Sequence, residues 1–321
     1  SKTLKERINE AEPGAVIDLG KEDLTIEEDV SYTIDKKLTI KNGDAKNATF
    51  TVESTGVEFV NLRNINSIIA DEDIGDGDLS VKNCFEINSV YVNGGGANSI
   101  HIAGTIIVNL YVAKQNVRVV LEASIETGDN AQATTIKNVQ INVDCKLESS
   151  DETATFEQVQ ISSGVEKVTL AGKAKIEKII AEIVPPSDEE GEEDVTVSPT
   201  IEVESSEVVI DKSSNNIDIT VPEDSDFEAT APEVIVETCT VTTVINSTEK
   251  TQTVYKGQNL LLDDPYLLNE EEKQEILDIL KQYSLIYRKK VRLDLSDSLK
   301  RSLITSAGKL NSISKIGSFS I

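Results

Sequence analysis

Ile100-His101-Ile102-Ala103-Gly104 is the stretch that decides the fold, because a similar stretch, Val119-Val120-Leu121-Glu122, begins 19 residues later. In each stretch, one apolar residue lies on each side of a central residue. Such pairs return along the first half of the chain at steps of 22, 19, 21, 19, 20 and 20 residues. A period near 20, with no helical pattern between the pairs, predicts a solenoid of short stacked strands. The pairs are Leu38/Ile40, Val60/Leu62, Leu79/Val81, Ile100/Ile102, Val119/Leu121, Val139/Ile141 and Val159/Ile161.

The composition argues against an aromatic-lined binding cleft of ordinary size. The 321 residues are 38% hydrophobic but only 4% aromatic, with no Trp and no Met, whereas ligand clefts draw heavily on aromatic side chains. The hydrophobic share is sufficient for a solenoid, since a strand needs apolar side chains only at its inward positions. The length suits one long solenoid or two ordinary domains.

The charge balance restricts the partners that can be expected. The chain carries 57 acidic and 31 basic residues, a net charge of −26. Because a surface this negative repels phosphate groups, we expect no nucleic-acid partner. The charge either aids solubility or attracts divalent cations or a basic partner. No apolar run is long enough to span a bilayer, so no transmembrane segment is expected.

The N-terminal residues predict a short amphipathic helix over 3–12. Thr3 and Glu6 have the spacing of a capping box, and Pro13-Gly14 stops the helix before strand-like alternation begins. One face of this helix is apolar and consists of Leu4, Ile8 and Ala11.

This beginning of the chain resembles that of right-handed parallel β-helices of the pectate-lyase-like superfamily. The resemblance is carried by Ile8-Asn9-Glu10-Ala11, by Pro13-Gly14-Ala15-Val16-Ile17 and by Lys37-Leu38-Thr39-Ile40-Lys41. It covers the first 40 or so residues closely, and the repeats out to about residue 180 only in pattern. It implies that the helix plugs the open end of the solenoid. The same scaffold carries lyases, hydrolases, adhesins and inert surface proteins, so no catalytic position is carried over.

The predicted fold class is therefore all-β: a right-handed parallel β-helix, a solenoid of about 20 residues per coil. An N-terminal capping helix and a smaller, α-containing C-terminal cap would cover its open strand edges. A leucine-rich repeat is the rival interpretation, suggested by Val57, Val60 and Leu62. It is weaker because Val and Ile outnumber Leu and no helical segment separates the returns.

Three regions are expected along the chain. Residues 1–13 form the N-terminal capping helix, 14–248 the parallel β-helix, and 249–321 an α/β capping region. The acidic run at 185–195 cannot fold on itself at neutral pH and is expected to project as a loop. A separate small β domain over 195–248 stays an open alternative.

The C-terminal cap has a helical signature and one basic cluster. Asn269 and Glu272 have capping-box spacing, and the cluster is Arg288-Lys289-Lys290. We expect this cluster to dock on the acidic face of the solenoid or on the acidic loop. The alternative is that it faces a membrane or an acidic glycan.

The run 71–78 contains the candidate metal ligands. Carboxylates separated by glycines can converge on Ca²⁺, which takes about six to eight oxygen ligands. The run lacks the spacing and the closing Glu of an EF-hand loop, so a solvated acidic loop is the alternative, and no other cofactor is expected. The ligands would be Asp71, Asp73, Asp76 and Asp78.

No catalytic residue is predicted. Lyases of this scaffold pair a basic residue with clustered acids, and Arg63 and Arg118 are the Arg residues of the repeat region, but neither lies in a recognisable lyase motif. His101, the single histidine, is expected to lie exposed on a strand without a role. Two further sets are interpreted as structural: a ladder of Asn66, Asn88 and Asn109, and the buried thiols of Cys84, Cys145 and Cys239.

The leading functional hypothesis is a non-enzymatic β-helix of the bacterial cell surface or exterior that acts as a structural, adhesion or interaction module. Such a protein would be monomeric, would bind a polysaccharide or a host or cell-surface protein, and could be lipid-anchored. The first alternative is a polysaccharide lyase or glycoside hydrolase. The second is an assembly component that binds a protein through its C-terminal helices.

Overall fold

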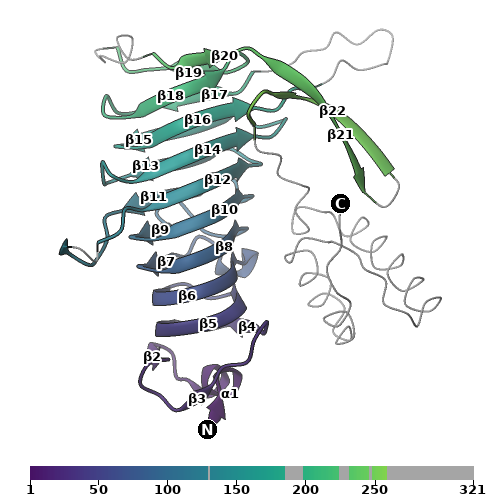
Figure 1. Cartoon of the computed structure of the whole chain (residues 1–321). Helices are drawn as coiled ribbons and strands as arrows, with labels where there is room; N and C mark the ends of the chain where they lie inside the picture. The colour runs from purple at the N-terminus through teal and green to yellow at the C-terminus, as the bar shows by residue number, and fades with distance from the viewer. Residues whose placement is uncertain (129–130, 185–197, 224–230, 246–247, 259–321) are drawn as a thin grey trace. The chain divides into compact units, whose positions relative to one another are not determined.

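The computed structural model describes residues 1–128, 131–184, 198–223, 231–245 and 248–258. These residues form an all-β parallel solenoid of about 10 turns with about 21 residues per coil, together with one α-helix (Figure 1). The predicted all-β parallel solenoid with about 20 residues per coil is confirmed. In the described residues, no helix combines the length and the apolar character needed to cross a membrane.

Two parallel ladders of strands run through the solenoid, and each coil contributes one strand to each ladder. Ladder A consists of β2 (Ala15–Asp18), the first parts of β5 (Leu38–Val52) and β6 (Val57–Ala70), β7 (Leu79–Lys82), β9 (Ile100–Ala103), β11 (Arg118–Glu122), β13 (Cys145–Ser149), β15 (Lys167–Gly172), β17 (Thr200–Val203) and β19 (Asp218–Thr220). Ladder B consists of β4 (Ser31–Ile34), the last parts of β5 and β6, β8 (Phe85–Val92), β10 (Ile106–Val112), β12 (Thr135–Ile141), β14 (Thr155–Ile161), β16 (Lys175–Ala181), β18 (Val209–Ser214) and β20 (Glu233–Ile235).

The core is built from columns of apolar side chains that point inward and repeat from coil to coil. Because a parallel ladder keeps its register, one inward position recurs in every strand and its side chains stack. All members of the following two columns are fully buried. In ladder A one column is Ile40, Phe59, Val81, Ile102 and Leu121; in ladder B one is Phe50, Ile68, Val90, Leu110, Val139, Val159 and Ile179.

The corner after ladder A is made by a second kind of column. Asn42, Asn61, Asn83 and Gly104 directly follow residues that pair in register, and their φ angles are +60°, +52°, +50° and +55°. This left-handed conformation is adopted readily by Gly and tolerated by Asn. Asn61 Nδ2 donates to Asn42 Oδ1 at 3.2 Å, and Asn42 Nδ2 donates to Asp18 Oδ2 at 3.0 Å. The corner column is thus stabilised by hydrogen bonds that run from coil to coil.

The N-terminal end begins with β1 (Lys2–Thr3), which pairs with β3 (Leu24–Thr25), and with α1 (Leu4–Glu10). The predicted capping box is present, because Thr3 Oγ1 accepts from the Glu6 N–H and the Glu6 carboxylate accepts from the Thr3 N–H. Leu4 and Ile8 are buried in the same core as the first strands. The apolar face of α1 therefore packs on the first coils.

At the other end, both ladders continue through β17 to β20, which pair in register with the coils before them. A two-stranded sheet of β21 (Thr238–Ile245) and β22 (Thr248–Tyr255) follows. Among the described residues, those of 1–240 and 253–258 belong to one compact unit, and those of 241–252 belong to another. The acidic loop, the helix at Asn269 and the basic cluster predicted from the sequence lie outside the described residues.

Candidate functional site

The outward side of ladder A, here called outer face A, carries charged side chains that pair between coils. One outward column contains Ser80, His101, Val120 and Glu148 in register. The neighbouring outward positions hold Arg118 and Glu122, one on each side of this column. Outer face A therefore gathers the single histidine, an arginine and two carboxylates from three successive coils.

Arg118 and Glu148 form the best-defined pair on this face. Arg118 Nε lies 2.8 Å from Glu148 Oε2 and Nη2 lies 2.7 Å from Oε1, while Nη1 donates to the Asn98 side chain. The two side chains are only 21% and 20% exposed. Hydrogen bonds from Arg118 lower the pKa of Glu148, and the same bonds raise the pKa of Arg118. Both groups are thus held in their charged forms.

The imidazole ring of His101 has a polar contact at each of its two nitrogen atoms. Its Nδ1 lies 2.7 Å from Glu122 Oε1 and its Nε2 lies 3.3 Å from the Asn98 carbonyl oxygen. Its side chain is 20% exposed. The expectation that His101 is exposed was wrong, because Glu122 of the next coil and Asn98 of its own coil lie against the ring.

Further ion pairs extend this arrangement along outer face A. Lys82 Nζ lies 2.9 Å from Glu58 Oε1 in the preceding coil, and Lys167 Nζ lies 3.0 Å from Glu202 Oε2 in the following coil. Pairs of this kind add little stability, because solvent screens the attraction between exposed charges. Their main effect is to fix the positions of the outward side chains. Arg63, the second arginine singled out from the sequence, lies 3.5 Å from Asp44 and is 65% exposed.

The four predicted calcium ligands do not form a chelating cluster. The Asp71 carboxylate accepts from the Asp73 N–H and caps the 3-10 turn η1 (Glu72–Ile74). Asp78 accepts from the Thr55 hydroxyl at 2.7 Å, which lowers its pKa, and the Asp76 side chain is 90% exposed. Across the residues that the structure describes, no three His, Cys, Asp or Glu side chains are arranged to hold a metal ion. Calcium binding here stays a prediction.

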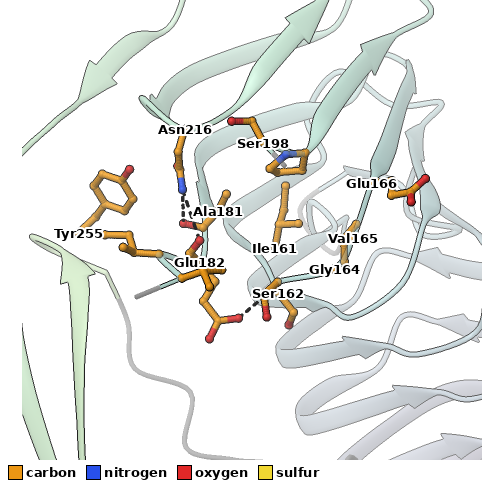
Figure 2. A pocket seen from close by; sticks show the side chains of 14 residues that line it. Ile161, Ser162, Gly164, Val165, Glu166, Ala181, Glu182, Ser198, Asn216 and Tyr255 are labelled. Carbon is orange, nitrogen blue, oxygen red and sulfur yellow. Dashed lines mark hydrogen bonds between the residues drawn. The ribbon is translucent and has the colours of Figure 1, made fainter. Parts of the chain in front are cut away.

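A cavity of about 590 Å³ lies at the corner where ladder B strands lead into the next coil (Figure 2). Three successive turns line it: residues 162–166 after β14, residues 182–184 and 198–199 after β16, and Asn216 after β18. Tyr255 at the end of β22 completes the wall. We call this space the corner cavity.

The corner cavity combines hydrogen-bonding groups with an apolar wall. Asn216 Nδ2 donates to the carbonyl oxygens of Ala181 at 3.3 Å and Glu182 at 3.4 Å, and the Ser163 N–H donates to the Glu182 carboxylate at 2.8 Å. These bonds tie the turns of neighbouring coils together (Figure 2). The apolar wall consists of Ile161, Val165 and Pro199, all buried.

Nothing in the sequence singled out the corner cavity. Its walls come from separate turns and from Tyr255, which lies 39 residues beyond Asn216 along the chain. Only the coil register brings these positions together, and the sequence predicted the period without fixing that register.

The three cysteines differ in their surroundings. Cys84 and Cys145 are buried, and burial raises the pKa of each thiol to about 12. Cys239 is exposed. All three are free thiols, so the interpretation as buried small hydrophobes is confirmed for two and wrong for Cys239.

No family model, no curated protein and no solved structure matches this chain. Support for the fold comes from the strand register of the chain itself. Function must follow from the geometry of outer face A and the corner cavity.

Proposed function

We propose that the protein is a non-enzymatic β-solenoid of the bacterial cell surface or exterior that acts as a structural, adhesion or interaction module. The observation that carries this proposal is the pairing of charged side chains across the coils of outer face A. Solenoid faces serve as extended binding surfaces without a pocket. Side chains already held in place lose little conformational freedom when a partner binds. Outer face A is therefore suited to a partner that is itself long and repetitive.

A polysaccharide is the partner that suits this face best, and a host or cell-surface protein is the alternative. The net charge of −26 favours a neutral or basic partner, because an anionic polymer would be repelled unless a cation bridged it. The resemblance to the pectate-lyase-like superfamily, the extracellular location and a lipid anchor belong to the same proposal. Binding of a partner protein through the C-terminal helices concerns residues outside the described ranges and stays a prediction.

A polysaccharide lyase is the second candidate, because Arg118 lies beside the carboxylates of Glu148 and Glu122. In such a reaction the arginine would act as the base. It would remove the proton from the sugar carbon that bears the carboxyl group of the substrate. Hydrogen bonding to Glu148 raises the pKa of Arg118, which works against the neutral form that a base requires. This is why binding ranks above catalysis.

The test is to incubate the purified protein with a panel of plant, host and bacterial polysaccharides, with and without Ca²⁺. Retention on immobilised polymer, ultraviolet absorbance of unsaturated products and polymer size are measured together. Retention without turnover is the expected result. Turnover that is lost in Arg118→Gln would replace the binding proposal with the lyase.

A pair of variants locates the binding surface. Ser80→Tyr places a bulky side chain on outer face A, and Glu177→Tyr places the same side chain on an exposed position of β16 in ladder B. We expect Ser80→Tyr to reduce retention about tenfold and Glu177→Tyr to leave it unchanged. Equal retention by both variants would show that outer face A is not the binding surface.

A further inference from the structure

The corner cavity has the size and the mixed lining of a small-molecule site. Its volume of about 590 Å³ lies within the range of about 300–1,000 Å³ that is typical of ligand sites. It is lined by turns of three coils and lies apart from the columns that form outer face A. A ligand here would therefore be independent of any polymer bound to that face.

The charged residues that line the cavity determine which ligand charge it favours. Glu166 and Glu182 line the cavity, and among its lining residues there is no Lys, Arg or His. In the described part of the chain neither carboxylate forms a salt bridge, although Glu182 accepts one backbone N–H. A cation is therefore attracted to this cavity and an anion is repelled.

The cation that fits is organic rather than a metal ion. The carboxylates of Glu166 and Glu182 do not point toward one another (Figure 2), so they cannot chelate one ion between them. Hard metal ions such as Ca²⁺ need several converging oxygens. A single ammonium group needs only one carboxylate and can bind at Glu182 alone.

The interior of the cavity favours a hydroxylated ring over a plain alkyl chain. The hydroxyls of Ser163 and Ser198 line it and can exchange hydrogen bonds with ligand hydroxyls. Ile183 is partly exposed and Val184 is exposed, and these two lining residues offer an apolar surface to the C–H face of a ring. An amino sugar has all three features: an ammonium group, several hydroxyls and an apolar face.

We propose that the corner cavity binds an amino sugar in its protonated form, with the ammonium group at Glu182 and the ring against Ile183 and Val184. The site recognises the positive charge first, so acetylation of the amine removes the main attraction. This proposal does not depend on the function of outer face A, and either can fail without the other.

The test is a titration of the full chain, labelled with ¹⁵N, with glucosamine followed by amide chemical shifts. Glucose, N-acetylglucosamine and n-butylamine serve as matched probes that lack the charge, the free amine or the ring. We expect saturable shifts with glucosamine in the millimolar range, confined to turns 162–166 and 182–184, and weaker binding at higher salt. Affinity for each of the other three probes should be lower by about fivefold or more.

Variants separate recognition from general surface attraction. Glu182→Gln should weaken glucosamine binding about two- to fivefold, while Glu177→Gln, the same change at an exposed site outside the cavity, should have no effect. Thermal unfolding verifies that both variants are folded. The proposal is overturned if glucose or n-butylamine binds as tightly as glucosamine, if the shifts map elsewhere, or if the two variants behave alike.

Discussion

Arg118 and Glu148 are joined by two hydrogen bonds, of 2.8 and 2.7 Å, although Arg118 pairs in register with Lys146 and not with Glu148. The ion pair therefore runs diagonally between β11 and β13. A strand that slipped by one residue would break it and would also turn the inward column toward solvent. The pair thus reports on the correct alignment of two neighbouring coils.

Removing this pair should destabilise the solenoid in a pH-dependent way. Glu148→Gln should lower the free energy of unfolding by about 1–2 kcal/mol at pH 7. Arg118 lowers the pKa of Glu148 from its ordinary value of 4.5. The contribution is therefore present above pH 4.5 and is lost as the pH falls through the lowered pKa of the folded state. Urea unfolding at a series of pH values from 7 downward should show a difference that is constant above pH 4.5 and shrinks progressively at lower pH.

The matched control is Glu177→Gln, which removes an exposed carboxylate of β16. Its effect should stay within about 0.5 kcal/mol over the same pH range. A loss for Glu148→Gln that did not shrink at all as the pH fell below 4.5 would mean that packing of the side chain, and not the ion pair, is responsible.

Substitution of Gly104 in the corner column should be destabilising even when the new residue is alanine. Gly104 has a φ of +55°, and a Cβ there would lie 2.3 Å from Asn83 Oδ1. Gly104→Ala should therefore cost about 3 kcal/mol, combining backbone strain with this overlap. Gly128→Ala is the control, because its φ is +68° but nothing lies within 4 Å of its Cβ. It should cost only about 1 kcal/mol, and equal losses would refute the steric contribution.

The aromatic stack near the N-terminal end should be a major source of stability. Phe50 is fully buried, and its ring centroid lies 5.4 Å from that of Tyr32 and 4.9 Å from that of Phe59. Phe50→Ala should lower the free energy of unfolding by about 3–5 kcal/mol. Phe85→Ala removes a ring that is 41% exposed and should cost about 1 kcal/mol or less. Chemical denaturation of the two variants provides the comparison.

Thiol reactivity should distinguish the three cysteines. In the native protein at pH 8, Cys239 should react quickly with a thiol reagent such as DTNB, while Cys84 and Cys145 should not. Burial hinders access to the latter two and raises the pKa of each to about 12, so almost no thiolate forms. One thiol should be counted in buffer and three in denaturant. Cys239→Ser should abolish the native signal, and any that remained would mean that the coils open.

The sequence predicted the solenoid correctly because the inward columns are visible as a period. Leu79/Val81, Ile100/Ile102 and Val119/Leu121 are register partners in ladder A, as their spacing indicated. Burial of the inward side chains requires this recurrence, so it is imposed on the sequence itself.

Two of the predicted pairs continue the period of about 20 residues but belong to the other ladder. Val139/Ile141 and Val159/Ile161 belong to ladder B, although they follow Val119/Leu121 at the same step. The register partner of Val119 is Leu147, since residues 123–134 lengthen this coil between β11 and β12. Because of this insertion, the strand found 20 residues after β11 in the sequence is β12 of ladder B, where the next ladder A strand was expected.

Turns and outward contacts were harder to predict than the core. A ladder of Asn66, Asn88 and Asn109 was expected, yet Asn109 pairs in register with Ser89. The asparagines that stack at the corner are Asn42 and Asn61. Their left-handed backbone follows from the place of the turn in the coil, which periodicity does not locate. The contacts of His101 likewise depend on which coil lies above it.

Outer face A also sets a length. Parallel strands lie about 4.8 Å apart, so about ten coils make a strip of roughly 45–50 Å. Gain or loss of one coil would change the reach of the protein by about 5 Å while leaving the remaining contacts in place. The number of coils would therefore set the length of the binding face, and evolution or engineering can change that length one coil at a time.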